Sequence, residues 1–109
     1  MIENKIKIMN TFKQKKYSNL INNYLNKLFI LEKKNKFKNI LITVIYVYIN
    51  KMLSNSNIYI TIYPDIYKKQ ITNFLNIKKK YYKNKLSLIF KNKFKIPNIN
   101  FYLSNNNML

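Results

Sequence analysis

The sequence predicts an α+β fold, a two-layer sandwich in which three helices cover one face of a three-stranded sheet. Apolar residues recur at helical spacing in residues 17–31, 67–75 and 82–90, whereas they alternate with polar residues in 58–63 and 97–103. The chain has 109 residues, of which 48% are hydrophobic, enough for one modest core and too few for two. We therefore expect a single domain with the element order α-β-β-α-α-β.

The first helix is predicted from Tyr17 onward. Apolar side chains there follow the i, i+3, i+4, i+7 spacing of an amphipathic helix, and Asn and Lys fill the opposite face. The pattern fades in the lysine-rich segment 32–39. Residues 1–12 show no clear period, so we expect a basic N-terminal arm, loosely held or disordered, followed by one domain over 13–109.

Two strands are predicted in residues 40–50 and 58–63. The first segment, ILITVIYVYIN, is rich in β-branched and aromatic residues and is too apolar on both faces for an exposed helix. The second, IYITIY, alternates strictly and is followed by Pro64, which is typical of a half-buried strand. Because the polar loop between them is short, we expect an antiparallel hairpin. The alternation sets Ile58, Ile60 and Ile62 against Tyr59, Thr61 and Tyr63.

Two helical stretches and a third strand complete the chain. Asp65 is the predicted N-cap of the first stretch. No glycine or proline separates the two stretches, so two helices and one bent helix both fit the pattern. The segment PNINFYL, residues 97–103, alternates again, and proline is tolerated at the first residue of a strand. The inward positions of the two stretches are Tyr67, Ile71, Phe74 and Leu75, then Tyr82, Leu86, Ile89 and Phe90.

The charge balance predicts a polyanionic partner. The formal net charge is +18, with only three acidic residues, and a polyanion would relieve the resulting self-repulsion. Residues with A/T-only codons dominate the sequence, so drift in a very A/T-rich genome is an alternative explanation of the composition. Drift accounts for the use of Lys in place of Arg better than it accounts for the scarcity of acids.

A set of lysines in and after the last helical stretch is the candidate RNA-binding surface. If the apolar side chains of that stretch point inward, most of these ammonium groups project together into solvent, where they can neutralise phosphates. The alternative is a solvated helix face in a lysine-rich chain. The set contains Lys78, Lys79, Lys80, Lys83, Lys85, Lys91, Lys93 and Lys95, with Lys15 and Lys16, placed just before the first helix, as a secondary contact.

The outward side chains of the second strand offer another candidate contact. Aromatic rings on a sheet face can hold single-stranded RNA, and Tyr59, Thr61 and Tyr63 occupy such positions. Residues of this kind more often cover a sheet edge or lie under a loop. From the sequence we favour that structural interpretation.

Other functional classes are disfavoured. The chain has no Cys and no His, so it lacks thiolate ligands, disulfides and the commonest general base, and we expect no metal and no cofactor. Three scattered acids do not suggest acid/base catalysis, so we expect neither an enzyme nor a small-molecule substrate. No apolar run reaches the roughly 18 residues needed to cross a bilayer, and the start lacks a signal-peptide core. We expect a monomer in the cytoplasm.

Two segments, residues 41–64 and 95–106, resemble the ribosome-binding factor A family. In the first, Thr43-Val44, the loop 50–53 and the strand from Ile58 are similar to the family's Thr-Val pair, Ser-Lys-Asp-Leu loop and Val-Tyr-Val strand. In the second, KIPNINFYLSNN is similar to its Val-Pro-Glu-Leu-x-Phe strand and the polar segment that follows. Between them, YYKNKLSLIFKNKFK resembles the family's basic helix.

This resemblance implies a KH-like fold of type II and a role in ribosome assembly. The implied partner is the immature 30S subunit, bound through its 16S rRNA during late maturation and 5′-end processing. The family's Ala-x-Gly kink between two helices aligns near residues 77–81, which contain no glycine. Two alternatives remain, a permanent protein of the small ribosomal subunit and a basic peripheral protein of anionic membranes.

Overall fold

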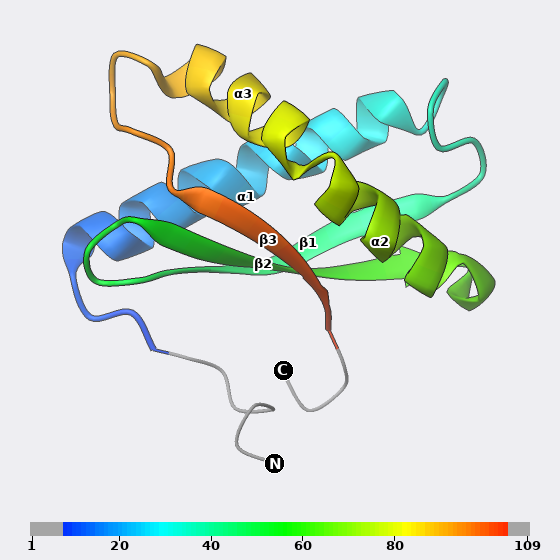
Figure 1. Ribbon diagram of the computed structural model, residues 1–109, viewed down its shortest axis with the longest axis horizontal. Coiled ribbons are helices and arrows are strands. Elements are labelled where there is room, and N and C mark those ends of the chain that lie inside the picture. The colour runs from blue at the N-terminus through cyan, green and yellow to red at the C-terminus, as the bar shows by residue number, and fades with distance from the viewer. Residues whose placement is uncertain (1–7, 105–109) are drawn as a thin grey trace.

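The computed structural model describes residues 8–104, and these residues form the predicted α+β sandwich with a KH-like arrangement (Figure 1). Most of the predicted N-terminal arm, residues 1–7, lies outside the described residues. The elements are α1 (Phe12–Glu32), β1 (Leu41–Ile49), β2 (Asn55–Tyr63), the 3-10 turn η2 (Asp65–Tyr67), α2 (Lys68–Ile77), α3 (Lys79–Phe90) and β3 (Asn98–Leu103).

The sheet has the order β1-β2-β3. Strands β1 and β2 pair antiparallel, as predicted, and β2 and β3 pair parallel. The register of β1 shifts between Val44 and Tyr46, which inserts Ile45 as an extra residue. The inward side chains of β1 therefore change from Ile42 and Val44 to Val47 and Ile49. This irregularity explains why the segment looks apolar on both faces in the sequence.

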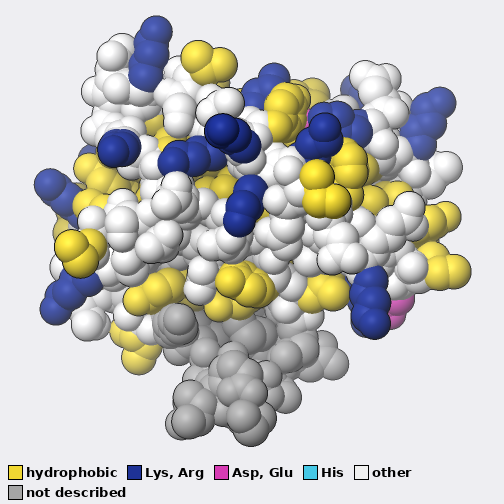
Figure 2. Space-filling view, viewed as in Figure 1, with side chains coloured by type: hydrophobic (Ala, Val, Ile, Leu, Met, Phe, Trp, Pro, Cys, Tyr) yellow, Lys and Arg dark blue, Asp and Glu magenta, His cyan; other side chains and the backbone are white. Residues whose placement is uncertain are grey.

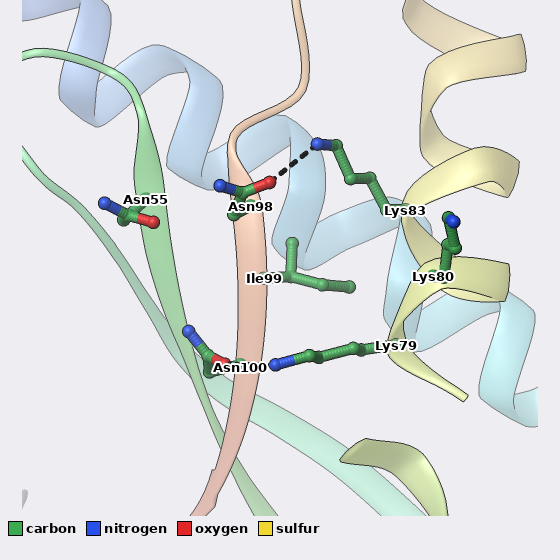
Figure 3. Close-up of a pocket in the computed structure, with 7 residues that line it drawn as sticks. All are labelled: Asn55, Lys79, Lys80, Lys83, Asn98, Ile99 and Asn100. Atoms are coloured by element: carbon green, nitrogen blue, oxygen red, sulfur yellow. Dashed lines mark hydrogen bonds between the residues drawn. The ribbon is translucent and has the colours of Figure 1, made fainter. Parts of the chain in front are cut away.

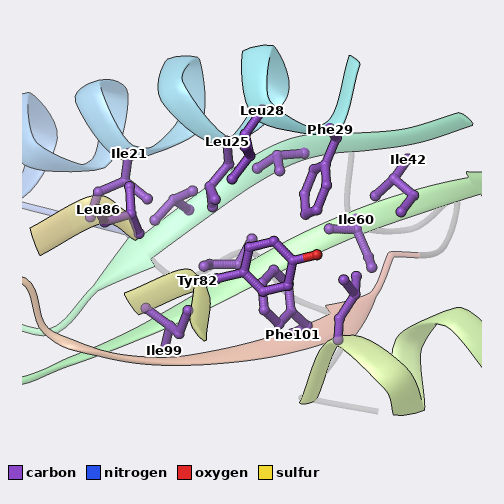
Figure 4. Packing of buried hydrophobic residues seen from close by; sticks show 14 of the residues in the cluster. Ile21, Leu25, Leu28, Phe29, Ile42, Ile60, Tyr82, Leu86, Ile99 and Phe101 are labelled. Atoms are coloured by element: carbon purple, nitrogen blue, oxygen red, sulfur yellow. The ribbon is translucent and has the colours of Figure 1, made fainter. Parts of the chain in front are cut away.

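The core lies between the sheet and the helices (Figure 4). Tyr82 of α3 is fully buried at its centre and contacts rings from two other elements. Its ring centroid lies 5.5 Å from that of Phe29 in α1 and 5.8 Å from that of Phe101 in β3. Because Tyr82, Leu86 and Phe90 fix the inner side of α3, Lys79, Lys80 and Lys83 project beside β3.

Helix α1 begins at Phe12, five residues earlier than its apolar pattern predicts. Thr11 caps it through a capping box, in which the Gln14 N–H donates to Thr11 Oγ1 at 3.1 Å and the Thr11 N–H donates to Gln14 Oε1 at 2.9 Å. Gln14 and Ser18 occupy inward positions of the first turns, so apolar spacing could not reveal them. The placement of Lys15 and Lys16 before the helix was therefore wrong, because both lie in α1.

The segment after Pro64 forms two helices, α2 and α3, separated at Lys78, where φ is −97° and ψ is 15°. The bend falls where the resemblance places the family's kink. The prediction that Asp65 caps α2 was wrong, since it begins a 3-10 turn and α2 has no side-chain cap. Tyr67 and Ile89 are exposed, contrary to prediction. Tyr67 belongs to the 3-10 turn, and Ile89 lies about 100° around α3 from the buried Phe90.

Candidate nucleic-acid interface

A hollow lies between the first half of α3 and the strand β3 (Figure 3). Lys79 and Lys83 are one helical turn apart, so both side chains leave α3 on the side of β3. Lys83 Nζ donates to Asn98 Oδ1 at 2.8 Å, and Lys79 Nζ donates to Asn100 Oδ1 at 2.9 Å. We call this hollow the lysine groove, and it is lined by Asn55, Lys79, Lys80, Lys83, Asn98, Ile99 and Asn100.

The alternation of side chains along β3 determines the side of the sheet from which the asparagines of the groove project. The side chain of Ile99 is buried in the core, so its neighbours Asn98 and Asn100 project to the other side of the sheet. The parallel register places Asn98 beside Asn55 at the start of β2, and the Asn98 N–H donates to the Ser54 carbonyl at 3.0 Å. The lysines of α3 thus reach across the edge of the sheet to residues on its far face.

Two further hollows adjoin the groove, and Lys83 lines both of them. One runs along the end of α3 and the loop that follows, where it is lined by Ser87, Lys91, Asn92, Lys93, Phe94, Lys95 and Ile96. The other reaches the loop between β1 and β2, with Met52, Leu53, Ser54, Lys95, Ile96, Pro97 and Asn98. None of the residues that line these three hollows is acidic, so their positive charge is not offset locally.

The acids within residues 8–104 lie elsewhere. Glu32, at the end of α1, is buried, accepts a hydrogen bond from Tyr82 Oη at 2.9 Å and pairs with Lys36 Nζ at 3.3 Å. Burial, together with the bond to Glu32, raises the pKa of Tyr82. Asp65 lies in η2, before α2.

The lysines of the predicted site fall into separate groups. Lys79, Lys80 and Lys83 line the lysine groove, and Lys78 is exposed at the bend just before it. Lys85 lines none of the three hollows. Its side chain lies instead by Tyr81, with Nζ 5.5 Å from the centroid of that ring. The structure therefore brings part of the predicted set together and leaves Lys85 apart.

The remaining predicted lysines lie toward the far end of α3. Lys91, Lys93 and Lys95 line the second hollow. The Tyr17 ring in α1 stacks on Phe94 at 3.9 Å between centroids, which brings the first turns of α1 to this loop. Lys15 and Lys16 belong to these turns. In the view of Figure 2, most lysine side chains lie over the helical side of the molecule.

The sequence prediction missed Asn55, Asn98 and Asn100 as parts of the site. The alternation in PNINFYL does place Asn98 and Asn100 on the outward side of a strand. Nothing in the sequence pairs them with lysines 15 and 21 positions earlier in the chain. That pairing depends on how α3 crosses β3.

The chemistry of the groove suits a phosphate-bearing ligand. A lysine ammonium has three donors, and a single bond to an asparagine oxygen uses one of them. The asparagine amides also contribute N–H groups, which suit the acceptors of a nucleobase. Within residues 8–104, no cluster of His, Cys, Asp or Glu could hold a metal ion. Across the same residues, every helix is too short or too polar to cross a membrane.

Comparison with solved structures supports the fold. Ribosome-binding factor A from Thermus thermophilus superposes with a TM-score of 0.65 at 16% sequence identity. The match covers 83% of this chain and 94% of that protein. No protein-family model matches the sequence, and no curated protein matches it.

Proposed function

We propose that the protein is a non-catalytic, ribosome-associated assembly factor that binds the immature small subunit through its rRNA. The observation that carries this proposal is the lysine groove, where Lys79 and Lys83 lie over the edge of β3 with no acid among the lining residues. The structural likeness to ribosome-binding factor A supports the same class of partner. The partner is the 16S rRNA of the 30S particle in late maturation, with a part in 5′-end processing, and the protein acts in the cytoplasm as a monomer.

The contact is electrostatic and directed by shape. The chain contains no Arg, so it has no planar guanidinium group to make two parallel hydrogen bonds to a guanine base. Lysines act as point charges on phosphates, and each neutralised phosphate releases counterions. We expect the logarithm of the binding constant to fall with the logarithm of salt by about 0.7 per phosphate neutralised on a single strand.

Co-sedimentation with purified ribosomal particles tests the proposal. The protein should sediment with immature small subunits at low salt and be released as salt rises. Sedimentation only with intact ribosomes, or with neither particle, would contradict it. Stoichiometric presence in translating ribosomes would instead identify a permanent ribosomal protein, and flotation with anionic liposomes that RNA does not compete away would identify a membrane protein.

A charge-matched pair of variants tests the groove itself. Neutralising it with Lys79→Gln, Lys80→Gln and Lys83→Gln should weaken RNA binding and reduce the salt slope by about 2, because three phosphate contacts are lost. The control changes three exposed lysines that follow α1 and removes the same net charge, through Lys33→Gln, Lys34→Gln and Lys38→Gln. Equal losses in both variants would show that total charge alone drives binding, and the groove would be rejected as the site.

A further inference from the structure

A row of tyrosine rings crosses the face of the sheet opposite the helices. Tyr46, Tyr59 and Tyr102 come from β1, β2 and β3 and are neighbours in the strand register. The Tyr46 and Tyr59 ring centroids lie 6.2 Å apart with 28° between the planes. Those of Tyr59 and Tyr102 lie 5.7 Å apart at 30°. The rings therefore form one continuous aromatic surface that belongs to all three strands.

This aromatic surface continues from the lysine groove along β3. Asn98, Asn100 and Tyr102 are alternate residues of that strand, so they share one face, with successive side chains about 6.6 Å apart. The two asparagines hold the ammonium groups of Lys83 and Lys79, which reach them from α3 (Figure 3). Tyr102 is therefore the next side chain on this face beyond the lysine contacts.

The ring of Tyr102 is accessible to a ligand. Tyr102 is 45% exposed, whereas Tyr59 is half-buried between its neighbours. A stable core does not require an aromatic residue at such a position, since Ile99 and Phe101 of the same strand fill the other face. Aromatic rings on sheet faces stack on unpaired bases. In a duplex the bases are stacked on one another, so they are not available to such a ring.

We infer that the ligand is a single-stranded RNA segment, with phosphates in the lysine groove and a base stacked on Tyr102 toward Tyr59. This inference rests on the proposed function and deepens it, because it names the form of RNA that the site takes. The groove alone would attract any polyanion. The adjoining ring adds a contact that only an unpaired base can make.

A fluorescent substitution tests the stacking directly. The chain contains no Trp, so Tyr102→Trp introduces a single indole as a reporter. A short unstructured RNA should quench its emission on binding, and the same RNA annealed to its complement should quench it far less. The control is Tyr81→Trp on α3, where Lys36 Nζ lies 4.4 Å from the ring centroid, and its emission should change little with either RNA.

Affinity measurements give an independent test. Tyr102→Leu should weaken binding of the single strand by at least about fivefold and leave duplex binding unchanged, since stacking is lost while the lysines remain. Tyr102→Phe keeps the ring and should retain full affinity. Circular dichroism of each variant verifies that the fold is intact, which an exposed position should permit.

The outcomes separate this inference from the proposed function. Suppose that RNA binds with the salt dependence of the lysine groove, while the indole emission of Tyr102→Trp and the affinity of Tyr102→Leu stay unchanged. The stacking site is then rejected and the proposed function stands. If no RNA binds, both are rejected. If Tyr102→Leu converts a dimer into a monomer without affecting RNA binding, the tyrosine face is an interface between copies, and the inference is overturned.

Discussion

The two edges of the sheet are closed in different ways. Along β1, side chains of α1 bond the backbone repeatedly. Asn26 accepts from the Val44 N–H at 2.8 Å and donates to the Val44 carbonyl at 3.0 Å, and Gln14 Nε2 donates to the Ile49 carbonyl at 2.8 Å. Ser18 Oγ donates to the Val47 carbonyl of the same strand. Helix α1 thus covers this edge through most of its length.

Within residues 8–104, a helix side chain bonds the backbone of strand β3 in the same way at Phe101. Asn76 of α2 accepts from the Phe101 N–H at 2.8 Å and donates to the Phe101 carbonyl at 2.9 Å. Toward the start of β3 the neighbours are instead the lysines of the groove, which bond the side chains of Asn98 and Asn100 and not the backbone. Exposed strand edges invite pairing with other chains, and charged lysines discourage it. The β1 edge therefore serves stability, whereas the first half of the β3 edge stays available to a ligand.

The largest effect should follow from opening the β1 edge. Asn26→Ala removes the partners of both the N–H and the carbonyl of Val44 beneath α1, which we expect to cost about 2–3 kcal/mol in the free energy of unfolding. Urea denaturation measures it. The control is Asn23→Ala, exposed on the same helix, which should change stability by less than about 0.5 kcal/mol. Similar small effects in both variants would show that α1 does not close this edge.

A smaller effect is expected at the β3 edge. Asn76→Ala breaks the corresponding pair of bonds to Phe101, but water can enter from the groove side and replace them in part, so we expect a loss of about 1–2 kcal/mol. Amide hydrogen exchange should show faster exchange at Phe101 than in the unmodified protein. Asn73→Ala, exposed on α2, provides the matched control. A loss larger than that of Asn26→Ala would reverse the order of the two edges.

Apolar periodicity predicted the elements because it records burial. The strands around Ile60 and Phe101 and the helices around Leu25 and Leu86 were all confirmed. The first turns of α1 escaped prediction because the side chains that face the sheet there are polar and bond to the β1 backbone. From the residue type alone, a polar side chain that bonds a strand edge cannot be distinguished from one that faces water. The helix start could therefore have been found only through its Thr11 cap.

The candidate site could be predicted only in part for a related reason. Lysine density located α3, but it could not separate Lys83, which reaches β3, from Lys85, which lies by Tyr81. The two residues differ by about 200° around the helix, and the buried positions of Tyr82, Leu86 and Phe90 fix that rotation. The asparagine partners depend on how α3 crosses β3, which no local pattern specifies.

The smallest effect on stability should come from the groove lysines. Lys79→Gln combined with Lys83→Gln breaks two exposed side-chain bonds and removes two charges from a chain of net charge +18, so lost bonding and relieved repulsion nearly cancel. We expect the free energy of unfolding to stay within about 0.5 kcal/mol of the unmodified protein, with any gain largest at low salt. Urea denaturation at two salt concentrations measures this, beside RNA binding by the same variant. Stability as low as that of Asn76→Ala would show that these lysines maintain the β3 edge, and the contrast between a structural edge and a binding edge would fail.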